Sequence, residues 1–511
     1  AWRTAHNAPN PALLDATDRM GMLVWDENHR NGEIEHAKLL VRRDRNHPSI
    51  IIWSICNEIL CDCGGGAASE LSLQQAREIK RVFQEHDPYG QRVVSANQNE
   101  WIVENNSLLD LLGFDYATDA YDSWHQMIPN RPAISSETSS AIGDRGEYVN
   151  DKEHGHVSEY GTETVPWGQT TEKAWGGYDK QSATNHMGIL TRNFVAGGFT
   201  WTGFDYRGEP TPYGWPDVSS HFGIYDIAGF EKDRVGWYKS WWPLEDKKKY
   251  QLRRSEMNHL HLFPHWNWAT TKEEVVQNPY LTLVPDSIVE VRVYSNAPVV
   301  ELFRNGVPVG ECRVMPKYGH LAWNVTFVSG NITARSYDSC DDNNNNNNKV
   351  ILQEVARVTT GPPIKLHATW SEKQNWMNHA KISDGIQEDQ VLLIRVDIVD
   401  ASDRIVPLPN EYPILVTFTI TSFNGILLGT GNGDPSDVTN DKSPHRNAYH
   451  GSVLGLIQAT IDSRNNKRNF DPFGMDSFEN DSLEIVVSSD GFEDVVIQLP
   501  IHTDSYRQPS L

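Results

Sequence analysis

The sequence predicts an α/β TIM barrel that is incomplete at its N-terminus, followed by two all-β sandwiches of the immunoglobulin-like kind. Three observations lead to this prediction. Short apolar runs alternate with helical patterns over residues 1–243, which is typical of a parallel sheet or barrel. Polar residues stand where several of these runs end, and barrels carry their functional residues at the carboxyl ends of strands. After Pro243 the helical periodicity gives way to short strands at regular spacing, as in β-sandwiches.

The strands of the first part are short, rich in Ile and Val, and apolar on both faces. Strands covered on both sides in a parallel sheet have this composition. We expect such strands at residues 21–27, 49–58, 92–96, 111–117, 131–137 and 198–206.

The clearest helix of the first part is expected over residues 72–85. Ser72 and Gln75 form a capping-box pattern at its start. An apolar stripe with helical spacing follows, made of Leu73, Ala76, Ile79, Val82 and Phe83. The turn signal His86–Gly90 ends the helix.

Polar residues follow the apolar part of five expected strands: Asp26-Glu27, Asn57-Glu58, Asp115-Tyr116, Glu137 and Asp205-Tyr206. Carboxylates at strand ends do not help a core strand to pack. Five such ends in one register therefore favour a functional site at the mouth of a barrel.

The remaining chain is predicted to form two β-sandwiches without catalytic residues. The sequence divides into a barrel at 1–243, a sandwich at 244–360 and a second sandwich at 361–511, with residues 360–363 as the linker between the sandwiches. The Asn run at 343–348 is interpreted as a solvated loop.

Charge and composition exclude several classes of partner. The 511 residues carry a net charge of −23, which argues against nucleic acids and anionic membranes as partners. No apolar run is long enough to insert into a membrane. Of the 17 tryptophans, 12 lie in residues 1–243. Indole faces suit the C–H faces of sugar rings, although a Trp-rich core explains the same count.

The cysteines and the glycosylation tripeptides indicate little about function or location. There are five cysteines, and no pair has the spacing of a zinc ligand motif. Cys312 and Cys340 could bridge neighbouring strands, but the sequence does not decide this. Four Asn-x-Ser/Thr tripeptides, at Asn105, Asn324, Asn331 and Asn480, lean toward a secreted or lumenal location.

Glu58 and Glu137 are the candidate catalytic pair. Each ends a barrel strand, so the two can face each other across the barrel mouth. Glycoside hydrolysis needs such a pair: one carboxylic acid protonates the leaving oxygen, and one carboxylate attacks the anomeric carbon or activates water. The alternative is that both are ordinary salt-bridged or helix-terminal glutamates.

The chain is similar to family 2 of the glycoside hydrolases, the group of retaining β-galactosidases, β-glucuronidases and β-mannosidases. The motif Arg45-Asn46-His47-Pro48-Ser49, followed by Trp53 and Asn57-Glu58, is highly specific for this resemblance. Residues 204–213, with Phe-Asp-Tyr and Gly-Glu-Pro-Thr-Pro-Tyr, resemble the β-galactosidase branch. The other matching pieces are Arg3–Asn7, Leu14–Asn28, Arg42–Asp44, Ser136–Glu137 and Arg145–Tyr148.

The resemblance implies roles for the pair and for five substrate-binding residues. It makes Glu58 the general acid/base and Glu137 the nucleophile. Asn57 would bind the sugar 2-hydroxyl, because an amide both donates and accepts hydrogen bonds. The four other candidates are His6 at the anomeric region, Tyr116 as a hydrogen-bond donor to the nucleophile, Trp201 under the sugar, and Asp26 on a sugar hydroxyl.

Each of these four candidates also has a structural alternative. His6 could be part of a capping loop, and Trp201 could belong to the barrel core. Tyr116 could be a core residue, with Tyr121 as its rival. Asp26 could hold the loop of His29 and Arg30.

Three departures limit the resemblance. Counting residues 1–3 as one strand gives seven barrel strands, so the first strand and the N-terminal domains of the family are expected to be cut away or absent. The magnesium ligands of the bacterial lactose-splitting enzyme are not matched by residues 28–32, so no metal and no cofactor is expected. Position 56 is Cys where Gly is frequent, and we assign it no nucleophilic role.

The expected function is that of a retaining β-galactosidase acting on a β-galactoside or related carbohydrate. A β-glucuronidase is the nearest alternative, but it needs basic residues for the C6 carboxylate, and no Asn-x-Lys motif stands in the expected mouth loops. The third alternative is a non-catalytic relative that binds carbohydrate. A homo-oligomer stays open.

Overall fold

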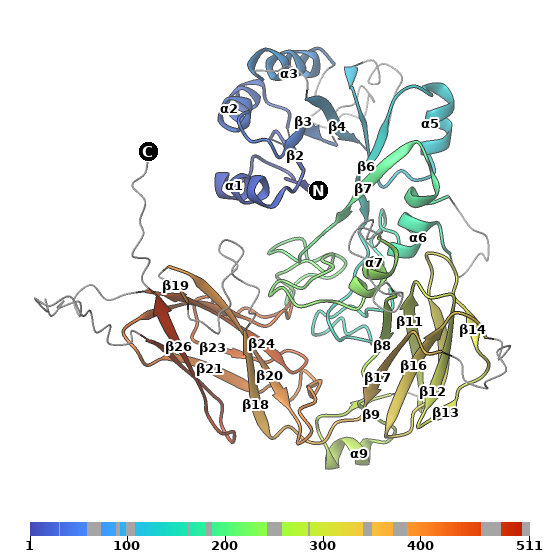
Figure 1. The fold of residues 1–511 in the computed structure, drawn as a ribbon, viewed down its shortest axis with the longest axis vertical. Coiled ribbons are helices and arrows are strands. Elements are labelled where there is room, and N and C mark those ends of the chain that lie inside the picture. The colour runs from blue at the N-terminus through green and yellow to red at the C-terminus, as the bar shows by residue number, and fades with distance from the viewer. Residues whose placement is uncertain are drawn as a thin grey trace, which may run out of the picture. The chain divides into compact units, whose positions relative to one another are not determined.

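The computed structural model describes most of the chain (Figure 1). The description covers residues 1–29, 31–58, 73–87, 92–98, 108–161, 164–179, 187–242, 258–284, 287–340, 350–370, 386–387, 389–460 and 482–502. Several positions that entered the predictions above lie outside these residues: Arg30, Ser72, residues 88–90, Asn105, Pro243, the Asn run at 343–348 and Asn480. Two of the five cysteines, Cys61 and Cys63, lie outside them as well. The described residues include no helix long and apolar enough to cross a membrane.

A seven-stranded parallel sheet forms the first part of the chain, with its strands in sequence order. All six predicted runs overlap a strand, and residues 1–3 supply the seventh. The last strand ends at Trp201 and not at Tyr206, so the prediction that Asp205-Tyr206 stands at a strand end is wrong. The strands are β1 (Trp2–Arg3), β2 (Val24–Glu27), β3 (Ile50–Asn57), β4 (Val93–Gln98), β5 (Leu112–Asp115), β6 (Ala133–Ser139) and β7 (Val195–Trp201).

Helices connect these strands, as expected of a β/α barrel. They are α1 (Pro11–Met20), α2 (Ile34–Asp44), α3 (Leu73–His86), α5 (Tyr121–Met127), α6 (Thr171–Gly176) and the 3-10 turn η1 (Ile189–Thr191). The predicted stripe of α3 is buried at Ala76, Ile79, Val82 and Phe83. Phe83 stacks on Trp53 of β3, with ring centroids 5.6 Å apart, so α3 packs on the sheet.

The interior of the sheet is tightly packed around an indole ring. Trp25 is fully buried with Ile52 and Leu111, and Phe199 packs against this cluster. A Cβ atom on Gly113 would lie 2.6 Å from the carbonyl oxygen of Ala96 and 2.9 Å from the Trp25 ring. Only glycine fits at this point of β5.

Two compact units make up the chain. One contains residues 1–142, 161–203 and 316–319, and the other contains 143–160, 204–315 and 320–511. Residues 204–242 therefore pack with the later part of the chain, where α7 (Val235–Trp241) contacts β8 and β11. The division into three domains at 243 and 360 stays a prediction.

The first sandwich follows α7 and encloses its own apolar core. One sheet contains β8 (Leu260–Phe263), β11 (Ile288–Ser295) and β15 (Leu321–Thr326). The other contains β12 (Val299–Arg304), β13 (Val307–Pro308), β14 (Arg313–Val314), β16 (Asn331–Tyr337) and β17 (Gln353–Val358). A short pair, β9 (Trp268–Ala269) and β10 (Thr282–Leu283), flanks the helix α9 (Lys272–Gln277).

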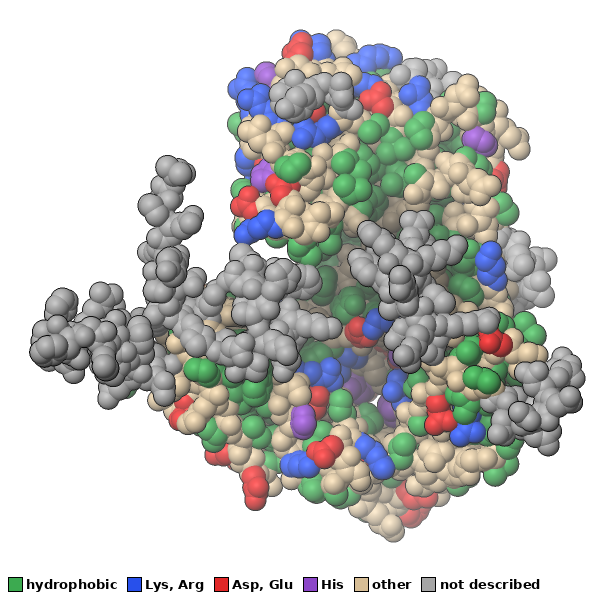
Figure 2. Space-filling view, in the orientation of Figure 1, with side chains coloured by type: hydrophobic (Ala, Val, Ile, Leu, Met, Phe, Trp, Pro, Cys, Tyr) green, Lys and Arg blue, Asp and Glu red, His purple; other side chains and the backbone are tan. Residues whose placement is uncertain are grey.

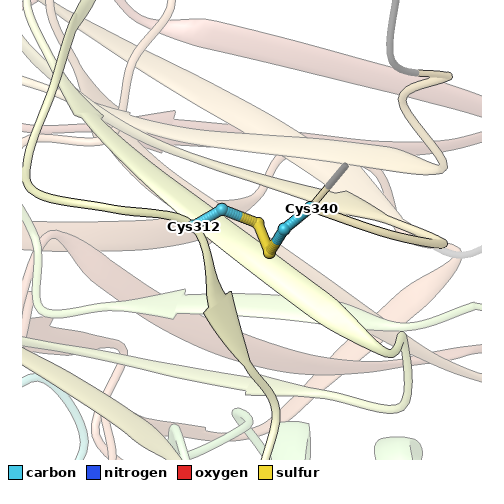
Figure 3. Close-up of a disulfide and its surroundings, with 2 residues drawn as sticks. All are labelled: Cys312 and Cys340. Carbon is cyan, nitrogen blue, oxygen red and sulfur yellow. A yellow bond between two sulfur atoms is a disulfide. The ribbon is translucent and has the colours of Figure 1, made fainter. Parts of the chain in front are cut away.

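Cys312 and Cys340 form a disulfide in this sandwich (Figure 3). Their Cα atoms are 5.7 Å apart, and 28 positions separate them in the sequence. The bond ties the chain just before β14 to the chain just after β16, which resolves the pairing that the sequence left open.

The second sandwich closes the chain around another apolar core. One sheet has the order β18 (Lys365–Trp370), β20 (Val391–Val399), β24 (Ser452–Ala459) and β22 (Gly425–Gly431). The other has the order β19 (Ile386–Gln387), β26 (Val495–His502), β25 (Ser482–Ser488), β21 (Leu415–Ile420) and β23 (His445–Asn447). The predicted change from β/α to all-β structure is confirmed.

A buried charge network holds the segment 143–160 to the segment 204–242 within the second unit. His221 is fully buried between Asp144 and Asp217, at 2.7 and 3.1 Å. Burial by itself lowers the pKa of His221, but the Asp144 and Asp217 carboxylates outweigh it and raise this pKa to about 10. The imidazole is therefore a buried cation at neutral pH.

Candidate active site

The carboxyl ends of the parallel strands bring polar side chains from all seven strands to one edge of the sheet. Parallel strands start and end together, so residues at their ends become neighbours. The contributors are Arg3 of β1, Glu27 of β2, Asn57 and Glu58 at the end of β3, Asn97 of β4, Asp115 and Tyr116 at the end of β5, Glu137 of β6, and Trp201 of β7.

Three carboxyl groups meet at the centre of this edge. Glu58, Asp115 and Glu137 each place a carboxylate oxygen within 4.8 Å of the other two. The two glutamates predicted as a pair are therefore neighbours in one site. The limit of 4.8 Å between their nearest oxygens lies below the roughly 6.5–9.5 Å between the carboxyl groups of inverting glycosidases.

Glu137 is held by two strong hydrogen bonds. The Tyr116 hydroxyl donates to its Oε1 at 2.5 Å, and the Arg3 guanidinium donates to its Oε2 at 2.6 Å. The carboxylate is only 6% exposed, so both oxygens are fixed in direction. Burial and the nearby Glu137 charge raise the pKa of Tyr116 well above its usual range, so the hydroxyl keeps its proton and donates it.

Glu58 occupies a different electrostatic environment from Glu137. It is partly buried directly after β3, with a left-handed backbone at φ 53°. Burial, and next the Glu137 charge, raise the pKa of Glu58 above its ordinary value. The shift favours the protonated form of Glu58, which is the form that a general acid needs.

Arg3 is the central cation of the site, and no separate role was predicted for it. Its Nε donates to Glu27 Oε2 at 2.9 Å, and its Nη2 donates to Asn57 Oδ1 at 2.7 Å. Burial alone would lower the pKa of Arg3, but Glu27 and Glu137 raise it further above its already high value. The quoted motif at residues 3–7 was the available signal for this role.

Asp115 is the second residue whose role sequence reasoning missed. It is fully buried and accepts a hydrogen bond from Ser136 Oγ at 2.6 Å. Burial, and next the charge of Glu137, raise the pKa of Asp115 well above its ordinary value. Its position at a strand end was noted in the sequence, and that position was the signal for a site residue.

The predicted substrate-binding residues fall into two groups. Asn57, His6, Tyr116 and Trp201 all lie in the site. The His6 ring stacks on Trp201 with centroids 5.0 Å apart, and its Nδ1 lies 3.3 Å from Glu27 Oε1. The Asn97 Nδ2 donates a hydrogen bond to Asn57 Oδ1 at 2.5 Å.

The rival Tyr121 is fully buried against Phe114, with ring centroids 4.5 Å apart. It belongs to the core of the barrel, and Tyr116 is the tyrosine that reaches Glu137.

Asp26 lies outside the site. Its side chain is fully buried and accepts from Thr4 Oγ1 at 3.2 Å. Burial, and next the neighbouring Asp44, raise its pKa well above the ordinary value. Side chains alternate along a strand, so the next residue, Glu27, is the one of β2 that meets Arg3 and His6. Asp26 as a sugar ligand has no support in this geometry.

Among the residues that the structure describes, two groups of side chains could supply metal ligands. One is the central set of three carboxyl groups, where Arg3 already provides positive charge. The other is His29, Glu33 and His36 around the start of α2, whose ligand atoms lie within 4.8 Å of one another. No metal site was predicted at residues 28–32, because they do not match the magnesium ligands of the family. The group of His29, Glu33 and His36 was not predicted.

Comparison with known proteins places the chain among glycoside hydrolases. The profile "Glycosyl hydrolases family 2, TIM barrel domain" matches residues 30–160, and "Glycoside hydrolase family 2 C-terminal domain 5" matches residues 383–467. Residues 286–341 match "Domain of unknown function (DUF4982)".

Curated relatives carry two different activities in their names. Beta-galactosidase BoGH2A of Bacteroides ovatus is 29% identical over 89% of this chain and 54% of its own length. A putative beta-glucuronidase of Formosa agariphila is 26% identical over 66% of this chain and 32% of its own length. The chain thus spans about half or less of the length of these relatives.

Solved structures share the fold. A beta-glycosidase from Bacteroides vulgatus aligns with 98% of this chain and 59% of its own, at a TM-score of 0.67 and 21% identity. A glycosyl hydrolase family 2 member from Bacteroides cellulosilyticus covers 97% of this chain and 56% of its own, at a TM-score of 0.66 and 22% identity. Two parts of the chain thus match domain models of glycoside hydrolase family 2, and the chain is similar to a beta-galactosidase over most of its length.

Proposed function

We propose that this chain is the catalytic part of a retaining glycosidase that cleaves terminal β-galactosides by double displacement. The observation that carries the proposal is the closeness of Glu58 and Glu137, whose carboxylate oxygens lie within 4.8 Å of each other. At this separation one carboxylate attacks the anomeric carbon directly, because no room is left for a water between them.

In the first step, a Glu137 oxygen forms a bond to the anomeric carbon as the glycosidic C–O bond breaks. Glu58 gives its proton to the departing oxygen, which leaves as an alcohol. Arg3 and Tyr116 hold Glu137 at 2.6 and 2.5 Å, so its lone pairs have a fixed direction before the attack. The product of this step is a covalent glycosyl-enzyme.

In the second step, Glu58 acts as the base. Having lost its proton, it takes one from a water molecule, whose oxygen attacks the anomeric carbon and releases Glu137. Two inversions give net retention. Burial, and next the Glu137 charge, raise the pKa of Glu58, which favours the protonated form that the first step needs.

Asn57 and the Trp201–His6 pair would bind the sugar. The Arg3 guanidinium faces Asn57 Oδ1, so the amide NH₂ is turned away from Arg3 and is free to donate to a hydroxyl group. The stacked indole offers an apolar face to the C–H side of a pyranose ring.

A galactoside fits the charge of the site better than a glucuronide. A glucuronate carboxylate needs a cation that is not already paired. Among the described residues of the site the permanent cation is Arg3, and it is already bonded to Glu27 and Glu137. The β-glucuronidase remains the second candidate, because several curated relatives carry that name.

The test compares nitrophenyl β-galactoside with nitrophenyl β-glucuronide, and follows the first product anomer by NMR. We expect the galactoside to be hydrolysed faster, with the β-anomer appearing first. Faster turnover of the glucuronide would overturn the substrate assignment. Release of the α-anomer first would overturn the double displacement, and no turnover of either would favour a carbohydrate-binding protein.

A further inference from the structure

A cavity of about 430 Å³ lies within the second compact unit and shares no residue with the carboxylate cluster. It is formed by the segment 143–160, the residues before α7, and both sandwiches. Figure 2 shows Lys, Arg and His side chains grouped around a hollow in the lower half of this face. Four arginines line the cavity: Arg145, Arg357, Arg395 and Arg404.

Two of the four arginines are fixed by carboxylates. Arg145 donates to Asp226 at 2.6 Å and to two backbone carbonyls, and Arg395 donates to Asp397 at 2.8 Å. These two guanidinium groups are rigid parts of the wall. Their charges are largely balanced by their partners.

Arg357 and Arg404 have unused hydrogen-bond donors. The described residues give Arg357 a single bond, from Nε to the carbonyl of Leu262 at 2.9 Å, and no carboxylate within 4 Å. Arg404 makes one long bond to the carbonyl of Thr359 at 3.5 Å and lies 4.0 Å from Asp400. A guanidinium has five N–H donors, so most donors of both groups are open to a ligand.

The acidic side chains of the wall do not fully neutralise these arginines. Glu231 binds Lys239 through both oxygens at 2.7 Å. Asp233 accepts from the Tyr148 hydroxyl at 2.6 Å and lies 2.8 Å from His261 Nε2. Burial alone would raise the pKa of Asp233, but His261, Tyr148 and the Arg357 charge lower it, so Asp233 offsets part of the Arg357 charge without a hydrogen bond between the two in the described residues.

Two histidines add polar atoms to the same wall. His265 Nδ1 accepts from the backbone N–H of Asn267 at 3.2 Å, so a neutral ring carries its proton on Nε2. Burial, and next the His450 charge, lower the pKa of His265 to about 3, which keeps the ring neutral. His450 lies 2.9 Å from Glu147 through Nε2, and its buried Nδ1 has no partner.

We propose that this cavity is a binding site for a sugar-sized anion, with Arg357 and Arg404 as the groups that bind its carboxylate, sulfate or phosphate. The volume lies in the range of small-molecule sites, roughly 300–1,000 Å³. Guanidinium groups bind such oxyanions in a bidentate manner. Tyr148 and Trp266 in the wall supply aromatic surface for the carbon skeleton. The proposal does not depend on the proposed glycosidase activity.

Calorimetric titration of the protein tests the site with four probes: inorganic sulfate, inorganic phosphate, glucuronate and glucose 6-phosphate, with neutral galactose for comparison. We expect at least one anion to bind, and its affinity to fall with added salt. Binding of the inorganic ions would identify the oxyanion alone as sufficient. Binding restricted to glucuronate or to the sugar phosphate would identify the source as a carbohydrate.

The double variant Arg357→Gln/Arg404→Gln should weaken the binding by at least about tenfold, since charged hydrogen bonds are lost. The matched control is Arg335→Gln on β16, whose exposed partner is Glu354. It should bind the anion as the unchanged protein does. Hydrolysis by the double variant should be unaltered, which separates binding here from binding at the carboxylate cluster.

Three results would overturn the proposal. The first is the absence of binding by any anion up to about 10 mM. The second is equal affinity of the double variant and the unchanged protein. The third is equal weakening by Arg335→Gln, which would identify general surface charge as the cause.

Discussion

Replacing Arg3 by Gln should destabilise the barrel more than any exposed substitution. Arg3 is the counter-charge of two buried carboxylates, Glu27 and Glu137, whose side chains are 0% and 8% exposed. A glutamine is shorter and neutral, so both carboxylates would lose their cation. Their direct partners would then be neutral groups such as the Tyr116 hydroxyl.

The size of the effect follows from this burial. Removing one partner of a buried ion pair costs about 3–5 kcal/mol, because a charge is left in a poorly solvated place. A domain is typically stable by only about 5–15 kcal/mol. The variant should thus lose a large fraction of its unfolding free energy.

Urea unfolding at neutral pH, followed by the fluorescence of the barrel tryptophans, measures this loss. The control is Arg81→Gln on α3, an exposed arginine paired with Glu78 and Glu85. Exposed pairs contribute about 0–1 kcal/mol. Equal stability of the two variants would refute the role given to Arg3.

Three further predictions concern stability. Asp144 and Asp217 raise the pKa of His221 to about 10 against the effect of burial. The contribution of the charged His221 to the unfolding free energy is therefore complete below about pH 6.5 and is lost as the pH rises toward 10. Urea titrations between these values should show the loss, and His221→Asn should remove it; a flat profile would contradict the buried imidazolium. Cys312→Ser opens a loop of 28 positions and should lower the unfolding free energy by up to about 3–4 kcal/mol; calorimetry with and without reductant checks this, and no difference would exclude a stabilising bond. Gly113→Ala should destabilise the barrel by about 1–3 kcal/mol through overpacking, whereas Gly214→Ala meets no atom within 4 Å and should be nearly neutral; equal unfolding midpoints would contradict the packing around Trp25.

Much of the barrel could be predicted because its strands are short apolar runs with polar ends. Each predicted run overlaps a strand, and the pair Glu58 and Glu137 came together as the strand order required. The helix over 72–85 was also predictable, because its apolar stripe has the helical period and is buried as expected.

The choice between neighbouring residues at one strand end could not be predicted from the sequence. Asp26 and Glu27 are both acidic and adjacent, and a shift of one residue decides which side chain faces the site. Arg3 was missed for a related reason. Its strand is only two residues long, so periodicity gave it no inward or outward face.

Interactions between charged residues far apart in the chain could not be predicted from the sequence either. His221 and its partner Asp144 are 77 positions apart in the sequence. The arginines of the cavity lie between positions 145 and 404. No local pattern links such positions. The grouping of residues 204–242 with the sandwiches depends on the same kind of distant packing.

The central claim is that Glu58 is the acid/base and Glu137 is the nucleophile. Hydrolysis of nitrophenyl galactoside and lactose by Glu58→Gln and Glu137→Gln tests it most directly, with Glu85→Gln on α3 as the control. Glu58→Gln should lose about 10²–10⁴-fold on lactose and much less on the nitrophenyl substrate, whose leaving group needs little protonation. Glu137→Gln should lose both, because no glycosyl-enzyme can form. Equal loss of the two substrates in Glu58→Gln, or appreciable activity of Glu137→Gln on either one, would contradict the assignment.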